Sequence, residues 1–416
     1  MKRMTAMFLV IAITLSITGC INGAPIGQRT DYMENISARA VDTPSDTVTG
    51  ALAMTEFGVQ LVQNSFEDGK NLLLSPLSVL CALAMTANGA KGQTLEQMEA
   101  VLGLPIEELG SYLHWYISSL PQGENYKLRL ANSIWFNEDS RFIPDQDFLQ
   151  INADYYGADI YSAPFDESTR KAINSWIEGK TDGMIKEALD NIPPAAVMYL
   201  INALSFDARW STVYQEHAVR DGIFTKADGS EQSVEMMHGK EYQYLSDDNA
   251  TGFIKYYEGG TYAFAALLPR EGLSIEEYVH SLTVEKLRTL LDSVQNTPVI
   301  TAIPKFETRY SVEMSQILSG MGMTDAFHLE NADFSGMGTS SAGNIFISRV
   351  IHKTFISVGE QGTKAGAVTI VEPTDGAAIE PDKQQEVILD HPFIYLLIDC
   401  ESGVPFFIGV MMDPAQ

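Results

Sequence analysis

The segment from Gly359 to Gln385, GEQGTKAGAVTIVEPTDGAAIEPDKQQ, constrains the fold most, because its two halves predict opposite environments. The first half alternates like a strand, in which successive side chains point to opposite faces. One face carries only small or uncharged side chains, those of Thr363, Ala365, Ala367, Thr369 and Val371. The Pro and Gly residues that follow favour an exposed loop instead. The sequence therefore predicts a loop whose first half can also enter a sheet without burying a charge.

The composition is that of a globular protein with a sizeable core. The 416 residues are 45% hydrophobic and 10% aromatic, which separates the chain from disordered proteins. The length allows two or three domains or one large domain. With 27 basic and 54 acidic residues, the formal net charge is −27. Such a surface repels phosphate groups, so we expect neither nucleic-acid binding nor a polyanionic cofactor.

The N-terminus is typical of a secretory signal peptide. Lys2 and Arg3 precede an apolar run that reaches about Ile17 and is too short for a membrane span. The run ends in Ile-Thr-Gly-Cys, which resembles the lipobox of prokaryotic lipoproteins and implies cleavage after residue 19 and lipidation of Cys20. An ordinary signal peptide with an incidental Cys is the alternative. Residues 20–47 are polar and aperiodic, which predicts a flexible tether.

No motif of an enzyme or a metal site stands out in the sequence. The chain has no GxSxG elbow, no HExxH and no GxGxxG opening a helix, and its seven histidines lack metal-ligand spacing. We therefore expect no catalytic activity, metal or cofactor, with a Ser-His-Asp set assembled from distant positions as the remaining enzymatic alternative. Cys81 and Cys400 lie in apolar sequence, where a free Cys behaves as a small hydrophobe. A single disulfide between them stays open.

The pattern of apolar residues predicts an α+β fold. Helical periodicity predicts helices over Ala51–Phe66, Ser75–Ala87, Thr94–Leu102, Glu107–Ser118, Thr169–Thr181 and Val284–Leu291. Strand patterns cover Lys127–Phe136, Val197–Phe206, Tyr262–Leu268, Val299–Phe306, Ile345–Glu360, Val387–Asp399 and Pro405–Val410. Ser75 and Pro76 are typical of an N-cap and a first helical position. Helices mostly precede the long strands, which argues against a regular βαβ winding.

Five blocks of sequence, in the same order along the chain, resemble the serpin family. They are Asn71–Met98, Leu200–Trp210, Pro304–Met337, His352–Ala367 and Val387–Leu397, the last with its polar-polar-Pro-Phe step. Together they cover the chain from about Val48 to Pro414. The resemblance implies one domain over residues 48–416, with three β-sheets and eight to nine helices. It also implies an exposed reactive-centre loop over about residues 360–386.

The resemblance explains the two-sided segment described above. In inhibitory serpins the hinge segment is part of a loop in the native state and becomes a central strand of the large sheet after cleavage. The hinge residues would be Glu360, Gly362, Thr363, Ala365, Gly366 and Ala367. Neither Pro nor a charge occurs on the inward face from Thr363 to Val371, which favours a suicide inhibitor of serine proteases. The alternative is a non-inhibitory surface binding protein of the serpin fold.

The resemblance also implies roles for individual residues. The usual loop length places the scissile bond at Gly376-Ala377, but the interval to Pro392 is about five residues longer than usual, so Ala378 and Ile379 are alternatives. Small apolar residues there suit elastase-like or subtilisin-like proteases. Further residues match the polar cluster and the Trp that gate the opening of the sheet: Ser75, Ser78, Asn202, His352 and Trp210. We expect a secreted, lipid-anchored monomer on a prokaryotic surface, bound covalently to its target protease.

Overall fold

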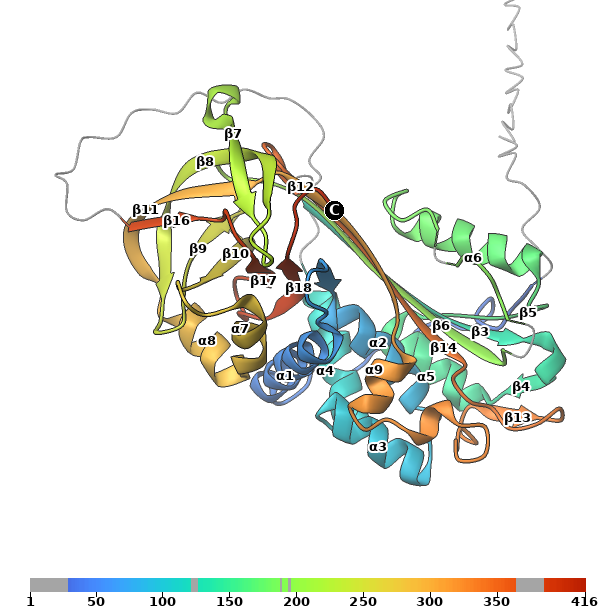
Figure 1. Cartoon of the computed structure of the whole chain (residues 1–416). Helices are drawn as coiled ribbons and strands as arrows, with labels where there is room; N and C mark the ends of the chain where they lie inside the picture. The colour runs from blue at the N-terminus through green and yellow to red at the C-terminus, as the bar shows by residue number, and fades with distance from the viewer. Residues whose placement is uncertain (1–28, 121–125, 188, 194–195, 364–384) are drawn as a thin grey trace, which may run out of the picture.

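A computed structural model gives the structure of the chain, and it describes residues 29–120, 126–187, 189–193, 196–363 and 385–416 (Figure 1). Within these ranges it contains nine α-helices and three β-sheets, as expected for the predicted fold. None of the described helices combines the length and apolar character that crossing a membrane requires.

The long sheet has seven strands and carries the hinge. In spatial order its strands are β1 (Thr30–Asp31), β5 (Asp159–Ala163), β3 (Tyr126–Asn137), β6 (Met198–Arg209), β15 (Gly362–Thr363), β14 (Arg349–Gly359) and β12 (Phe306–Glu313). The two-residue β15 is antiparallel to both of its neighbours, β6 and β14. Beyond the end of β15, β6 and β14 pair directly with each other in parallel, from Arg349↔Tyr199 to Phe355↔Ser205. We call this direct pairing the seam.

The second sheet has nine strands. Its path is β16 (Gln385–Ile388), β11 (Gln295–Pro304), β8 (Glu231–Ser246), β9 (Ala250–Tyr256), β10 (Tyr262–Pro269), β17 (Phe393–Asp399), β18 (Pro405–Met411) and β2 (Leu72–Leu74), with β7 (Val219–Thr225) beside β8. A small sheet pairs β4 (Phe142–Pro144) with β13 (Gly338–Ser340).

Helices cover both faces of the long sheet (Figure 1). The helices of the described chain are α1 (Thr47–Ser65), α2 (Pro76–Ala87), α3 (Gly92–Leu102), α4 (Ile106–Ser119), α5 (Gln146–Tyr156), α6 (Glu167–Lys180), α7 (Ile275–Ser281), α8 (Val284–Asp292) and α9 (Ser315–Gly320). Of these, α7 and α8 lie beside the second sheet (Figure 1). The α2 helix is buried along its whole length and lies beneath β3 and β6. Its N-terminus is capped by Ser75, whose side chain accepts a hydrogen bond from the Ser78 amide.

The α6 helix packs on the opposite face of the long sheet and forms a second core there. Its Ile173, Trp176 and Ile177 are buried with Tyr199 of β6 and Phe355 of β14, among others. The helix is amphipathic, so its polar face is left to the solvent. The long sheet is therefore enclosed between two layers, and any widening of the seam must disturb both.

The structure corrects two predicted strands. The strand predicted over Val299–Phe306 ends at Pro304, and Phe306 begins β12 in the long sheet. The strand predicted over Val387–Asp399 is divided into β16 and β17, because Pro392 lacks an amide hydrogen for the ladder. All six predicted helices are present, whereas α5 and the short α7 and α9 were not predicted.

The predicted flexible tether over residues 20–47 also differs from the structure where the structure describes it. Thr30 and Asp31 form β1, which pairs antiparallel with β5 at the edge of the long sheet. Arg39 forms a bidentate ion pair with the buried Asp154 of α5, at 2.9 and 2.7 Å. Pairing at a sheet edge uses the main chain, so it leaves no apolar period for sequence reasoning to detect.

The two cysteines within the described residues are not joined to each other. Cys81 is buried in α2, and Cys400 is exposed directly after β17. Both are free, so the disulfide that the sequence left open does not form. The exposure of Cys400 differs from its expected role as a small hydrophobe, because the apolar run before it ends with β17.

Candidate functional site

The seam is held by a buried cluster of polar side chains. His352 of β14 and Asn202 of β6 are register partners, and His352 Nδ1 lies 2.6 Å from Asn202 Oδ1. The Ser78 hydroxyl of α2 donates to the same Asn202 oxygen at 2.8 Å. The amide of Ser75 donates to His352 Nε2 at 3.1 Å. All four side chains are fully buried. The structure thus brings together the four residues that the family resemblance grouped, across two strands and one helix.

These hydrogen bonds determine the protonation of His352. Because Nε2 accepts from a backbone amide, the ring proton resides on Nδ1 and is donated to Asn202. Complete burial lowers the pKa of His352 to about 3, so the ring is neutral at physiological pH. A second proton on Nε2 would face the Ser75 amide, which is itself a donor. The neutral imidazole is therefore the only form that satisfies both neighbours.

The hinge enters the long sheet at Gly362 and Thr363. Gly362 has a φ of +152°, and a Cβ added there would lie 2.0 Å from the carbonyl oxygen of Ala208. Only glycine can therefore bring this backbone between β6 and β14 without strain. The fully buried hydroxyl of Thr363 lies 2.5 Å from the hydroxyl of Tyr257. Thr363 thus points inward, as predicted for the small face of the segment.

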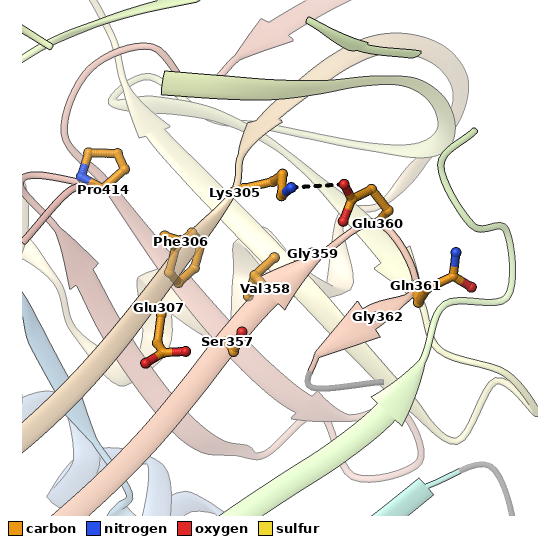
Figure 2. A pocket seen from close by; sticks show the side chains of 10 residues that line it. All are labelled: Lys305, Phe306, Glu307, Ser357, Val358, Gly359, Glu360, Gln361, Gly362 and Pro414. Atoms are coloured by element: carbon orange, nitrogen blue, oxygen red, sulfur yellow. Dashed lines mark ion pairs between the residues drawn. The ribbon is translucent and has the colours of Figure 1, made fainter. Parts of the chain in front are cut away.

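An ion pair holds the turn before the hinge. Lys305, between β11 and β12, contacts Glu360 at 2.8 Å (Figure 2). It also contacts Glu235 of β8 at 3.1 Å. Partial burial is the largest single influence on the pKa of the Glu360 carboxyl and acts to raise it. The hydrogen bond from Lys305, a backbone hydrogen bond and the charge of Lys305 together outweigh burial and lower the pKa below its ordinary value. A surface cavity of about 440 Å³ lies beside this turn, lined by Lys305, Glu360 and Gly362 among others. The cavity belongs to the hinge.

Trp210 lies beside the hinge, directly after β6. Its indole nitrogen donates to the carbonyl of Gly359 at 2.8 Å, and its amide donates to the carbonyl of Gln361 at 2.9 Å. Its ring stacks on Tyr257, with centroids 4.4 Å apart. These two hydrogen bonds to the main chain fix the turn against the end of β6. This is the place that the resemblance assigned to it.

Sequence reasoning missed the partners of the hinge, which are Tyr257, Lys305 and Glu235. Lys305 lies inside one of the five blocks, but no spacing rule connects it with Glu360. Other predicted residues lie outside the described part of the chain. They are Cys20, the hinge residues Ala365, Gly366 and Ala367, and the reactive-bond residues Gly376, Ala377, Ala378 and Ile379. In the part that the structure describes, no three His, Cys, Asp or Glu side chains are grouped to hold a metal ion.

Comparisons with known proteins agree with this geometry. The model of the family described as "Serpin (serine protease inhibitor)" matches residues 52–414. A serpin-like protein of Thermococcus kodakarensis is 32% identical, over 87% of this chain and 85% of its own length. The leukocyte elastase inhibitor of Equus caballus is 31% identical, over 87% of this chain and 98% of its own length. The crystal structure of tengpin, a thermophilic serpin, in its native state is 46% identical, with a TM-score of 0.89, and covers 93% of this chain and 100% of tengpin.

Acidification should destabilise the native fold through His352. The pKa is lower in the folded chain than the ordinary 6.5, so the unfolded chain binds more protons and stability falls as pH falls from 6.5 toward 3. Between pH 6.5 and 4.5 we expect a loss of about 2–3 kcal/mol from this group. Guanidinium unfolding at both pH values measures it. His352→Gln, which cannot titrate, should lose that much less, and equal losses in both proteins would refute the assignment.

Replacing Gly362 by Ala should expel the hinge from the sheet. The added Cβ meets the Ala208 carbonyl, a backbone atom that cannot move without breaking β6. We expect a lower melting temperature and altered Trp210 fluorescence, because both main-chain contacts of the indole residue lie on this turn. Gly359→Ala is the matched control, since a Cβ there has no heavy atom within 4 Å. If both variants behave alike, the tight fit at Gly362 is not what holds the hinge.

Proposed function

The chain belongs to the serpin family, and on that basis we propose that it inhibits serine proteases as a suicide substrate. The serine of the target attacks a carbonyl of the reactive loop, the peptide bond breaks, and the new N-terminus leaves as the amine. The acyl-enzyme remains attached to the residues that follow the hinge. Insertion of these residues between β6 and β14 then carries the protease along and distorts its active site before water can release it.

The pairing of β15 is the observation that carries this proposal. Gly362 and Thr363 already form ladder pairs with both β6 and β14, so insertion has its first step in place. Continuing the antiparallel register from Thr363↔Ala208 would set Val371 opposite Leu200. Thr363 is buried and points inward, and the residues at alternate positions after it are small or uncharged. A strand of this composition supports insertion because it buries no charge.

The energetics favour insertion once the loop is cut. About a dozen residues gain ladder hydrogen bonds worth roughly 0.5–1.5 kcal/mol each. The main-chain bonds of β6 and β14 that separate at the seam are replaced by bonds to the new strand. Burial of the small face adds to this, so the total is on the order of ten kcal/mol. The native fold is then a kinetically held state, with the cluster around His352 as part of the barrier.

The loop sequence favours a target with a shallow specificity pocket. Gly376 and Ala377 lie at the proposed scissile bond, and Ala378 and Ile379 follow. Side chains of this size suit elastase-like and subtilisin-like enzymes, whereas trypsin-like enzymes require a cation to pair with their pocket carboxylate. The similarity to a leukocyte elastase inhibitor supports this choice. With the signal sequence and Cys20, we place the inhibitor outside the cell, held at a prokaryotic surface by a lipid.

Trapping should be selective for the class of protease. Incubation with an elastase or a subtilisin should give a covalent complex that survives boiling in detergent, and trypsin should give little or none. Gly376→Arg should shift trapping toward trypsin, because the variant offers the required cation at the scissile bond. Electrophoresis of the mixtures measures both. If every protease only cuts the loop and turns over, inhibition is excluded, and if the variant gains nothing against trypsin, the scissile bond lies elsewhere.

Cleavage of the loop should raise the melting temperature by at least about 10 °C, since insertion adds a central strand. Thr369→Arg should abolish that rise, because it places a charge on the inward face. Thr369→Val is the matched control, with a side chain of similar shape and no charge at the same position, and should keep the rise. Calorimetry before and after cleavage gives the values. No rise in the unmodified chain would favour a surface binding protein of the serpin fold.

A further inference from the structure

A second cavity lies beside the seam, over β14 and β12, away from the hinge. It has a volume of about 340 Å³, within the range of small-ligand sites. Its walls come from three places: Met184 to Glu187 and Asp190 in the segment after α6, Arg309 to Ser311 of β12, and Lys353 to Phe355 of β14. We call residues 181–187 and 189–193 the covering segment. The cavity thus touches one strand of the seam and the chain that lies over it.

The covering segment is fastened to α6 and packs on the seam. Asn174 of α6 exchanges two hydrogen bonds with the main chain of Leu189, at 2.9 and 3.1 Å. Ile185 and Leu189 are buried in the same core as Phe355 of β14 and residues of β6. Insertion of a strand would separate β6 from β14 beneath this segment. A molecule that fills the cavity would therefore join the covering segment to the strands as they stand before insertion.

The charges in the cavity favour an anion. The chain carries a net charge of −27, yet this cavity is lined by the three cations Lys186, Arg309 and Lys353 and by the carboxylates of Glu187 and Asp190. Arg309 is paired with Glu307 at 2.7 Å, so the attraction for an anion depends on Lys186 and Lys353. Lys353 lies on the face that Phe355 shares, and burial lowers the pKa of its ammonium group. Asp190 and Glu187 act to raise that pKa, but among the described residues neither approaches Lys353 within the 4 Å of an ion pair.

The remaining wall suits a flat ring. Phe355 and Ile185 are nearly fully buried beside the cavity, and the Arg309 guanidinium lies over the Phe355 ring, 4.7 Å from its centroid. A ring placed here gains apolar contact, and an acidic substituent reaches Lys353. We propose that this cavity binds small aromatic carboxylates or sulfonates, and that the bound anion holds the seam closed. The binding stands on its own, whereas its effect on protease trapping rests on the proposed function.

The binding can be tested with 1-anilinonaphthalene-8-sulfonate as the probe, by isothermal titration of the native chain. Lys353→Met keeps the length of the side chain and removes its charge, and it should weaken binding at least tenfold. Lys171→Met is the matched control, because Lys171 is an exposed lysine of α6 outside the cavity. N-phenyl-1-naphthylamine, which lacks the sulfonate, should bind both variants and the unmodified chain alike. Equal sulfonate binding by all three proteins, or an equal loss in both variants, would overturn the proposal.

A separate measurement tests whether the bound anion holds the seam closed. A ligand that binds only the state before insertion stabilises that state in proportion to its occupancy. The sulfonate should therefore raise the melting temperature of the unmodified chain and leave that of Lys353→Met unchanged. With a trapped protease, it should also raise several-fold the number of inhibitor molecules consumed per protease. Binding without a melting shift would refute the closed seam. A chain that binds and shifts but never traps a protease would refute the proposed function instead.

Discussion

The parallel pairing of β6 with β14 is the contact on which the rest of the structure depends. It closes the long sheet below the hinge, and two layers of helix are built against it, α2 on one side and α6 on the other. Hydrophobic burial alone would not distinguish registers that differ by two residues, because both keep the same faces buried. Here the register is specified by His352 and Asn202, which face each other across the pair. A polar contact therefore selects which closed arrangement the apolar layers stabilise.

The stability of the closed sheet depends on the hydrogen bonds of the polar cluster around His352. The network is not fully satisfied, because the buried Asn202 Nδ2 has no hydrogen-bond partner among the described residues, and an unpaired group in a low dielectric costs more than a satisfied one contributes. His352 bonds to β6 and to the start of α2, so separating the strands breaks contacts on two elements at once. Such a barrier is steep but local. It suits a fold that must wait in one state and then change quickly.

Much of the fold could be predicted from the sequence, because six of the nine described helices and most of the long strands carry clear periodicity. The break at Lys305 could not, since Pro304 and Phe306 lie in one apolar run but pair in different sheets. For the site, the family resemblance named Ser78 and His352, although only the fold brings them within one hydrogen-bond network. The contacts of Tyr257 and Lys305 with the hinge could not be predicted, because residues far apart in the sequence leave no local pattern when they pair.

The small strand β1 places the N-terminal part of the chain at the opposite end of the long sheet from the hinge. Asp31 pairs with Tyr161, which lies in the same row of the long sheet as Tyr199, near the start of β6. The hinge pairs at the other end of β6, with Ala208 and Arg209, roughly 30 Å away along the strand (Figure 1). A chain anchored through its N-terminus would therefore hold the hinge at the end of the long sheet that is farthest from the anchor. Under the proposed mechanism, a protease carried along an inserted strand would finish at the end of the long sheet where β1 pairs, so an anchor joined to the N-terminus would have to leave room for a second protein.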